Sequence, residues 1–269
     1  MVRPPLVTAL FVPADRPERF SKAQSSGADA IIIDLEDAAA PGAKATARST
    51  LCLPGVLPTG GDVLVRVNGR QTPWYGDDLA AVARLPIAGV VLPKTESAED
   101  VTDTSKSIPG VPLIALIETA RGLAAVREIS AAFGVIRLAF GSIDFCVDIG
   151  AAHGRDVLLA ARSAIVLASR LGELEPPLDG VTTSIDDSTL VEEDARYAYR
   201  LGFGGKLCVH PRQIIPVRRG FASTPEEIAW AKRILAAGAE GAISVDGTMV
   251  DSPVRARARK ILGLDAKNS

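Results

Sequence analysis

AIIIDLED, residues 30–37, sets four apolar residues in succession before the carboxylates of Asp34, Glu36 and Asp37. A short apolar run rich in β-branched residues is typical of a strand that is buried on both faces, as in a parallel sheet. Carboxylates are costly to bury unless they are paired, so the acidic end marks the point where this strand leaves the core. The stretch therefore predicts a buried parallel strand with charged groups at its carboxyl end.

Further runs of this kind recur along the chain, separated by stretches with helical periodicity or by Gly and Pro. Strands that alternate with helices form βαβ units and a parallel sheet, and eight of them close into a barrel. We therefore predict an α/β fold, a (β/α)8 TIM barrel that forms the catalytic domain over residues 1–222. The predicted strands are VTALFVP from Val7, AIIIDLED from Ala30, VLVRVN from Val63, GVVLPK from Gly89, PLIALIE from Pro112, IRLAFGSID from Ile136, LDGVTT from Leu178 and KLCVHP from Lys206.

The chain continues beyond the last predicted strand into residues 223–269. TPEEIAWAKRIL predicts a helix that is capped by Thr224 and carries two glutamates in its first turn, where they favour the helix dipole. Asp246-Gly247 lies between β-type residues and predicts a hairpin turn, and Pro253 predicts the start of a final helix. We expect this C-terminal extension to serve as a lid or as an arm that reaches a neighbouring subunit.

The composition is that of a folded protein with a large core and little net charge. Hydrophobic residues make up 47% of the chain and charged residues 23%, which differs from the composition of disordered proteins. The net charge of -2 offers no field that attracts nucleic acid or an anionic membrane, so neither is an expected partner. No apolar stretch approaches the roughly 20 residues of a membrane span. The 3 widely spaced cysteines argue against a disulfide framework, and we expect a cytoplasmic enzyme.

Polar side chains follow several of the predicted strands where each strand ends. Besides the acids after residue 33, these are Arg66 and Asn68, Lys94, Glu118 and Asp144. In a barrel the carboxyl ends of all strands meet at one mouth, which is where catalytic groups of this fold lie. Charges that converge on one ring are costly unless they are paired or bind something, so the pattern favours an active site.

Glu118 and Asp144 follow the fifth and sixth predicted strands, so their carboxylates should be neighbours. Two adjacent carboxylates repel each other unless one is protonated or a cation lies between them. Mg2+ accepts one or two carboxylates and completes its shell with water and substrate oxygens, and neither His nor Cys is at hand for zinc. The alternative is that each acid caps a helix or pairs with arginine.

Arg66 has a planar guanidinium that suits bidentate binding of a substrate carboxylate. It can equally form an internal ion pair with Glu36 or Asp37, and the two roles are compatible. We expect these acids to orient Arg66. Lys94 is either a Schiff-base nucleophile or a cation that balances the acids, and the acids favour the second role because they keep the amine protonated.

The remaining candidates are weaker on sequence grounds alone. Arg16, just after the first strand, can contact an anionic ligand or be a solvated arginine at a helix start. His210 after the eighth strand is more typical of a hydrogen-bonded loop residue than of a general base, and His153 in a Gly-rich loop is expected to be exposed. The sequence has no Ser/His/Asp arrangement, Walker sequence or Rossmann glycine pattern that would indicate a hydrolase triad or a nucleotide-dependent enzyme.

The motif blocks taken together resemble those of the citrate lyase β-subunit-like proteins, within the wider HpcH/HpaI aldolase and malyl-CoA lyase superfamily. The resemblance spans essentially the whole chain. The blocks are, in order, LFVPADRPERF, IIIDLEDA, VRVN, VVLPK, ALIETARG, LAFGSIDF and GGKLCVHPRQI.

The resemblance implies a role for each candidate. Glu118 and Asp144 match Mg2+ ligands, and Glu118 would also lie against the substrate. Arg66 matches the catalytic arginine that binds the substrate's oxygens, and Arg16 resembles part of the thioester-carrier site. Asp246 matches an acidic residue that serves the active site of a neighbouring subunit. Two departures from the family pattern, Ala14 in place of a frequent glycine and Thr248 in place of a frequent basic residue, bear on the carrier.

We therefore expect a Mg2+-dependent carbon–carbon lyase of the retro-Claisen or aldol type. Its substrate would be a short hydroxyacyl thioester, such as a malyl, citramalyl or citryl group on coenzyme A or an acyl carrier protein, with a carboxylic acid as the other partner. We expect a homo-oligomer, a trimer or a hexamer. The alternatives are a metal-dependent aldolase that acts on a free keto acid and a non-catalytic subunit or binding protein.

Overall fold

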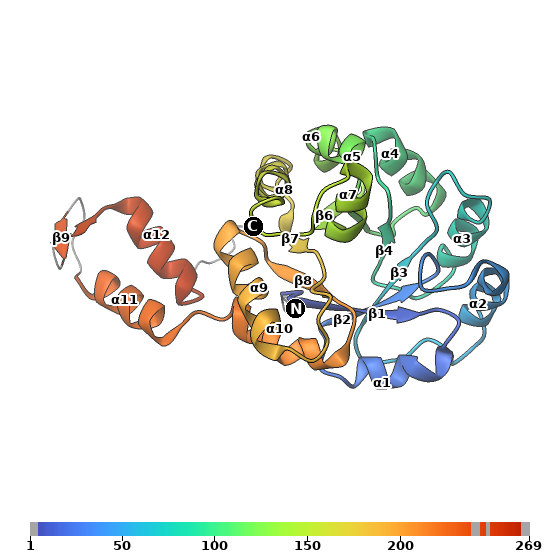
Figure 1. Ribbon diagram of the computed structural model, residues 1–269, viewed down its shortest axis with the longest axis horizontal. Helices are drawn as coiled ribbons and strands as arrows, with labels where there is room; N and C mark the ends of the chain where they lie inside the picture. The colour runs from blue at the N-terminus through green and yellow to red at the C-terminus, as the bar shows by residue number, and fades with distance from the viewer. Residues whose placement is uncertain (1–4, 238–242, 246–247, 265–269) are drawn as a thin grey trace. The chain divides into compact units, whose positions relative to one another are not determined.

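In the computed structural model, residues 5–237, 243–245 and 248–264 are described. The barrel part of the chain is a closed ring of parallel strands that follow one another in chain order, β1 to β8, which confirms the predicted TIM barrel (Figure 1). The strands are β1 (Thr8–Pro13), β2 (Ala30–Asp34), β3 (Asp62–Arg66), β4 (Gly89–Leu92), β5 (Leu113–Ile117), β6 (Val135–Phe140), β7 (Glu175–Asp179) and β8 (Gly205–Cys208).

Helices surround this ring on its outside (Figure 1). Their starts have local causes, and α4 is an example: the Ser97 hydroxyl accepts a hydrogen bond from the Asp100 backbone N–H, and the Asp100 carboxylate accepts one from Ser97. The helices are α1 (Phe20–Gln24), α2 (Lys44–Leu51), α3 (Tyr75–Val82), α4 (Ala98–Ser107), α5 (Ala120–Ala124), α6 (Val126–Ser130), α7 (Ser142–Ile149), α8 (Leu159–Leu171), α9 (Ser188–Leu201) and α10 (Ile214–Phe221), with 3-10 turns η1 (Pro17–Arg19), η2 (Pro41–Ala43) and η3 (Pro211–Gln213).

The strands are apolar throughout because both of their faces are buried. In β2, Ile32 belongs to the core inside the barrel, whereas Ile31 and Ile33 pack in the core between the strands and the helices. Successive side chains of a strand point to opposite faces, which produces this alternation. Each fully buried Ile or Leu side chain contributes about 1.5–3 kcal/mol, so the two cores together select the barrel.

The same alternation places the charged groups. Asp34, Arg66 and Glu118 each follow, two residues later, an inward-facing apolar side chain of β2, β3 or β5. Their side chains therefore continue the inward rows of the barrel beyond its apolar interior. Sequence alternation thus brings three charges to the carboxyl end of the ring.

β7 differs from its prediction, since it begins at Glu175 and not at Leu178. Pro176 and Pro177 lie inside it, and proline is unusual within a sheet because it has no N–H to donate. The pairing of β6 with β7 is irregular at this point. Arg137 of β6, buried, donates from Nε to the Pro176 carbonyl at 2.6 Å, so a side chain replaces part of the missing ladder.

The chain divides into two compact units, residues 1–221 and 222–269. The second unit has a small core of its own, which includes Ala231, Ile234, Val250 and Ala258. It contains α11 (Pro225–Ala236), the antiparallel strands β9 (Ile243–Val245) and β10 (Thr248–Val250), and α12 (Ser252–Ile261), with Thr224 capping α11 and Pro253 in the first turn of α12 as the sequence predicts.

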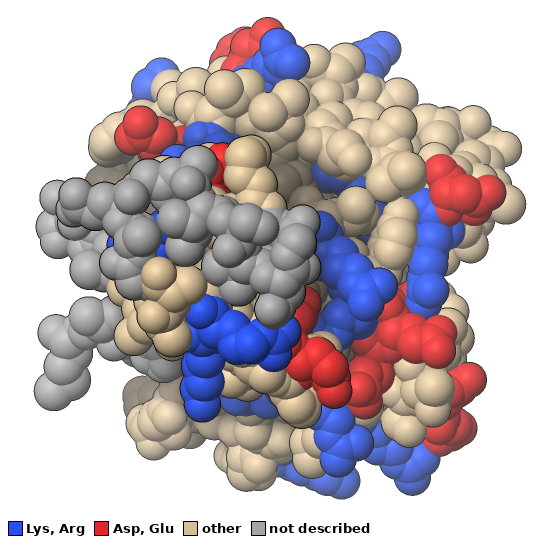
Figure 2. All heavy atoms as spheres, turned by 90° about the vertical axis from the view of Figure 1, so that its left-hand side faces the viewer, with Lys and Arg blue, Asp and Glu red and all other residues tan. Residues whose placement is uncertain are grey.

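Acidic and basic side chains are interspersed on the face of the molecule in Figure 2, in keeping with a net charge of -2. In the part of the chain that is described, no helix is long and apolar enough to cross a membrane.

Candidate active site

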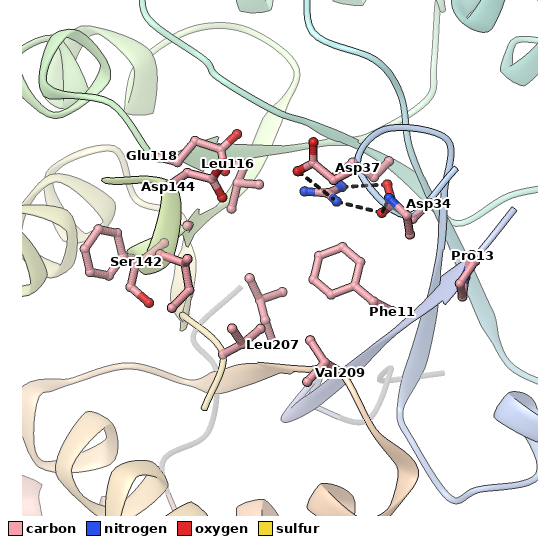
Figure 3. Close-up of a pocket in the computed structure, with 16 residues that line it drawn as sticks. Phe11, Pro13, Asp34, Asp37, Leu116, Glu118, Ser142, Asp144, Leu207 and Val209 are labelled. Atoms are coloured by element: carbon pink, nitrogen blue, oxygen red, sulfur yellow. Dashed lines mark hydrogen bonds and ion pairs between the residues drawn. The ribbon is translucent and has the colours of Figure 1, made fainter. Parts of the chain in front are cut away.

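A pocket of about 380 Å3 opens at the carboxyl ends of the barrel strands (Figure 3). Its charged lining consists of Asp34, Asp37, Arg66, Glu118 and Asp144. The sequence prediction that charged strand ends meet at one mouth therefore agrees with the arrangement of these side chains.

Arg66 is held by Asp34 on the neighbouring strand. The two residues are direct partners in the β2–β3 register, and Arg66 donates to both carboxylate oxygens, from Nε at 2.7 Å and from Nη2 at 2.6 Å. The guanidinium carbon lies 4.8 Å from the centre of the Phe11 ring, which supports it from another side. Burial alone would lower the pKa of Arg66, but hydrogen bonds and charge from Asp34, with the charge of Glu36, raise it above its ordinary value. Arg66 is therefore a fixed, permanently charged group.

The predicted supporting residues gather around this arginine. Glu36 is buried, and its Oε2 lies 3.0 Å from Arg66 Nη1 as an ion pair without a directed hydrogen bond. Its other oxygen accepts a hydrogen bond of 2.5 Å from Lys94 Nζ. Burial raises the pKa of Glu36 despite the opposing charges of Arg66 and Lys94. Asp37 is 58% exposed at its side chain and lies 3.5 Å from Arg66.

Glu118 comes directly after β5 and is 1% exposed. Its Oε1 accepts a hydrogen bond of 2.7 Å from the backbone N–H of Lys94. Lys94 has φ +47°, a left-handed conformation that is unfavourable for a residue with a side chain, and this conformation presents its N–H to the carboxylate. Burial, followed by the charge of Glu36 and, more weakly, that of Asp144, raises the pKa of Glu118 to about 8.

The sequence suggested that Asp144 ends a strand, and this prediction was wrong. β6 stops at Phe140, and Asp144 lies in the first turn of α7. Gly141 makes the turn close enough for the two acids to meet: a Cβ at this position would be 2.4 Å from Glu118 Oε2. Glu118 and Asp144 consequently lie on the same side of the pocket (Figure 3).

The residues present fit a divalent cation with oxygen ligands. Glu118 and Asp144 repel each other, and the raised pKa of Glu118 reflects the cost of ionising it without a cation. Among the described residues, no group of three or more His, Cys, Asp and Glu is arranged to hold a metal. The protein would thus provide two carboxylates and leave the remaining positions to water and substrate, which is typical of Mg2+.

Comparison with known proteins decides the family. Residues 8–211 match the family described as HpcH/HpaI aldolase/citrate lyase. The chain belongs to this family. It is 40% identical over 263 residues to the citrate lyase subunit beta-like protein of Mycobacterium tuberculosis, covering 94% of this chain and 93% of that protein. It is 32% identical over 268 residues to a (3S)-malyl-CoA thioesterase of Cereibacter sphaeroides, covering 96% and 94%.

The fold agrees with solved structures of the family. The structure of the protein CitE from Mycobacterium tuberculosis in complex with magnesium, acetoacetate and coenzyme A has a TM-score of 0.88 and 37% identity, covering 98% of this chain and 99% of that one. The citrate lyase beta subunit of the same organism, complexed with oxaloacetate and magnesium, has a TM-score of 0.72 and 36% identity, covering 81% and 98%.

Four of the predicted site residues of this HpcH/HpaI family member are not among the described residues that line the pocket. Glu36 and Lys94 are outside the lining, and Glu36 pairs with both Arg66 and Lys94. Arg16 follows β1 and is exposed, with its guanidinium 3.9 Å from Glu18, and it does not line the pocket. Asp246 lies outside the described residues, so its role stays a prediction.

The sequence interpretation missed the part played by Asp34. It considered Glu36 and Asp37 as partners of Arg66, whereas Asp34 makes the bidentate contact. A signal was available, because Asp34 and Arg66 occupy equivalent inward positions of neighbouring strands.

The sequence interpretation also missed a contact between a serine and a histidine. Ser142 Oγ, at the start of α7, lies 3.0 Å from His153 Nε2. Ser142 is only 1% exposed, and its hydroxyl packs so closely on Gly180 that a Cβ there would lie 2.2 Å away. The contact ties the loop of His153 to the start of α7, and Ser142 also belongs to the pocket lining.

A second buried charge cluster lies beside the barrel ends. Asp179 at the end of β7 accepts hydrogen bonds from Arg162 of α8 at 2.8 Å and from Lys206 of β8 at 3.1 Å. Burial alone would raise the pKa of Asp179, but the charges of Lys206 and Arg162 hold it below its ordinary value. His210 caps η3 by accepting a hydrogen bond from the Arg212 backbone, which is the loop role that the sequence favoured.

Proposed function

We propose that this protein is a Mg2+-dependent carbon–carbon lyase that acts on a short hydroxyacyl thioester of coenzyme A or an acyl carrier protein. The observation that carries the proposal is the paired Glu118 and Asp144 beside a fixed Arg66 in one pocket at the barrel mouth. The names of its relatives, which include citrate lyase subunits and malyl-CoA thioesterases, and the magnesium, keto acids and coenzyme A in related structures support it.

Glu118 and Asp144 would hold the metal. When bound, Mg2+ supplies a Lewis acid that draws electron density from substrate oxygens. Arg66 binds the carboxylate and the hydroxyl oxygen of the substrate and stabilises the negative charge that develops there. Because Asp34 fixes its guanidinium beforehand, Arg66 needs little reorganisation as the reaction proceeds.

Cleavage breaks the bond between the hydroxyl-bearing carbon and the carbon next to the thioester. The hydroxyl releases its proton to solvent and becomes the carbonyl of a keto acid, while the bonding electrons pass to the thioester fragment as an enolate. A proton then returns to the α-carbon of this enolate, and we propose Asp246 as its source. The same groups catalyse condensation in reverse.

We also propose that the extension, residues 223–269, acts as a lid or inter-subunit arm in a homo-oligomer, a trimer or a hexamer. The extension has its own small core, so it can move or dock as a unit. Asp246 of one subunit would then serve the Glu118 site of another. Mixing inactive Asp246→Asn and inactive Glu118→Gln chains, after labelled chains have shown subunit exchange, should restore activity; background activity would contradict the arrangement.

The test of the main proposal is a screen for Mg2+-dependent cleavage and condensation with short hydroxyacyl-CoA thioesters. We expect turnover that chelation abolishes and Mg2+ restores. A free keto acid substrate with no response to coenzyme A thioesters would favour a metal-dependent aldolase. Binding of Mg2+ and ligand without turnover of any thioester would favour a non-catalytic subunit.

A further inference from the structure

Lys44 is a buried lysine that the proposed mechanism does not use. It is the first residue of α2, is 5% exposed and does not line the pocket. Its ammonium donates three hydrogen bonds, to the carbonyl of Leu35 at 2.9 Å, to the carbonyl of Glu36 at 2.7 Å and to Oδ1 of Asn68. The Trp74 ring lies against it, with its centre 4.8 Å from Nζ. An ammonium has three N–H groups, so all of them are used.

The three acceptors lie where the pairing of β2 with β3 ends. The Leu35 backbone N–H still donates to the Arg66 carbonyl, as in a parallel ladder. The next bond of such a ladder would run from the Asn68 N–H to the Leu35 carbonyl, but this N–H donates to Asp78 at 2.9 Å. The Leu35 carbonyl accepts hydrogen bonds from the side chains of Asn68 and Lys44. Side chains therefore replace the backbone in joining the ends of the two strands.

The segment that Lys44 holds also folds around Asp34. The Asp34 carboxylate accepts hydrogen bonds from the backbone N–H of Glu36 at 2.9 Å and from that of Ala38 at 3.0 Å. Asp34 thus holds this segment through its N–H groups, and Lys44 holds it through its carbonyls. A neutral side chain cannot replace the lysine here, because even an amide has only two N–H groups for the three acceptors.

This segment carries two of the acids that surround Arg66. Glu36 lies 3.0 Å from Arg66 and also accepts a hydrogen bond from Lys94. Asp37 lines the pocket close to Asp34 (Figure 3). If the carbonyls of the segment lost their partner, the backbone would shift and the acids would shift with it. Arg66 would then lose its fixed position, and a displacement of about 1 Å can reduce the rate of a reaction about a hundredfold.

Resting on the proposed function, in which Arg66 binds the oxygens of the substrate, we infer that Lys44 is a positioning residue for Arg66. It acts through the backbone of residues 35 and 36 and through Asn68. Its contribution is a positive charge with three donors at the point where the ends of β2 and β3 meet. The lysine itself contacts neither the substrate nor the metal.

The experiment is a double-mutant cycle in the full-length protein with Lys44→Met and Glu36→Gln. Methionine is unbranched like lysine but has no donor. Calorimetry on the Mg2+-loaded protein gives the Kd for pyruvate, a keto acid, and a thioester assay gives kcat/KM. Lys44→Met should weaken pyruvate binding several-fold and lower kcat/KM about a hundredfold. The loss in the double variant should be smaller than the product of the two single losses, because both changes act on the same guanidinium.

Mg2+ binding separates positioning from general destabilisation. Lys44→Met should keep the wild-type affinity for Mg2+ at pH 9, where Glu118 is ionised, because Lys44 contacts neither carboxylate that would hold the metal. Single losses that multiply in the double variant would overturn the inference. Parallel losses of Mg2+ and pyruvate affinity would overturn it as well.

Lys206→Met is the matched control. Lys206 is 2% exposed and donates to Asp179 and to the Gly180 carbonyl, so its replacement removes an equally buried ammonium from another part of the barrel. Its losses should multiply with those of Glu36→Gln. Coupling as strong as that of Lys44→Met would show that any buried lysine has this effect, and it would contradict the specific role of Lys44.

A second variant covers the case in which Lys44→Met does not fold, as judged by circular dichroism. Asn68→Ala removes one of the three acceptors and should show the same coupling with Glu36→Gln, whereas losses that multiply would overturn the inference.

The pyruvate measurement requires no turnover, so it separates this inference from the proposed function. A wild-type protein that binds pyruvate but cleaves no thioester would refute the lyase proposal, and the cycle would still test Lys44. A protein that cleaves thioesters without coupling between the two residues would refute the role of Lys44 alone. Neither pyruvate binding nor cleavage would refute both.

Discussion

Mg2+ binding should depend on pH because the metal must displace a proton from Glu118. Burial and neighbouring acids raise the pKa of this carboxyl to about 8. At pH 7 only about one tenth of the Glu118 carboxyls would then be ionised, so the apparent Mg2+ affinity should be about tenfold below its limit at high pH. The affinity should rise about tenfold from pH 6 to pH 7 and level off above the Glu118 pKa.

Isothermal titration calorimetry from pH 6 to pH 9, in buffers that differ in ionisation enthalpy, measures both the affinity and the proton that is released. Glu118→Gln removes the charge with little change in volume, so it should bind Mg2+ more weakly and with no pH dependence over this range. Asp37→Asn removes an exposed carboxylate from the same pocket and should keep the pH dependence.

Two results would refute this reasoning. A flat wild-type profile from pH 6 to pH 9 would mean that Glu118 is ionised without the metal. A pH dependence that survives in Glu118→Gln would assign the proton to another group, and Glu36, whose pKa burial also raises, would be the first to test.

The same shift links pH to folding of the metal-free protein. The folded state keeps the Glu118 proton up to about pH 8, whereas the unfolded state releases it near the ordinary value of 4.5. The contribution of Glu118 to the free energy of unfolding is therefore full below pH 4.5 and is lost as the pH rises towards 8. Denaturant titrations with a chelator present should show that the free energy of unfolding of the wild type falls between pH 4.5 and pH 8 relative to that of Glu118→Gln.

The remaining predictions concern the neighbours of the metal ligands. Arg66→Lys cannot reproduce the two hydrogen bonds to Asp34, so kcat/KM should fall about a hundredfold or more, and an unchanged value would make the arginine structural. Lys94→Gly accepts the left-handed backbone, so urea denaturation should find it more stable than Lys94→Ala by about 1 kcal/mol; equal stabilities would exclude strain there. Gly141→Ala places a Cβ against Glu118 and should weaken Mg2+ binding in calorimetry; wild-type affinity would show that the turn relaxes freely.

The barrel was predictable because its strands are apolar on both faces and end in charge. Ile32, Leu64 and Leu116 show why: each fills the barrel interior, and the next inward position of its strand is charged. β7 was harder to place because Pro176 and Pro177 are atypical of a strand, and only the contact from Arg137 explains how they are accommodated.

The candidate site was predictable in its residue types but less so in its geometry. Asp144 looked like a strand end, because the sequence does not reveal that Gly141 turns the chain into a helix. The contact of Ser142 with His153 depends on how a loop folds back, and local patterns do not encode such a contact. Asp246 rests on the family resemblance and stays a prediction.

The Asp34–Arg66 pair has a consequence for how the barrel assembles. The two residues face each other only when β2 and β3 align in the native register. A slip of one residue would turn a charge into the apolar layer under the helices, where it would have no counter-charge. A misaligned barrel is therefore less stable, because the guanidinium that would bind the substrate and the carboxylate that holds it would be buried without each other. A molecule with an assembled site must consequently have β2 and β3 in the native register.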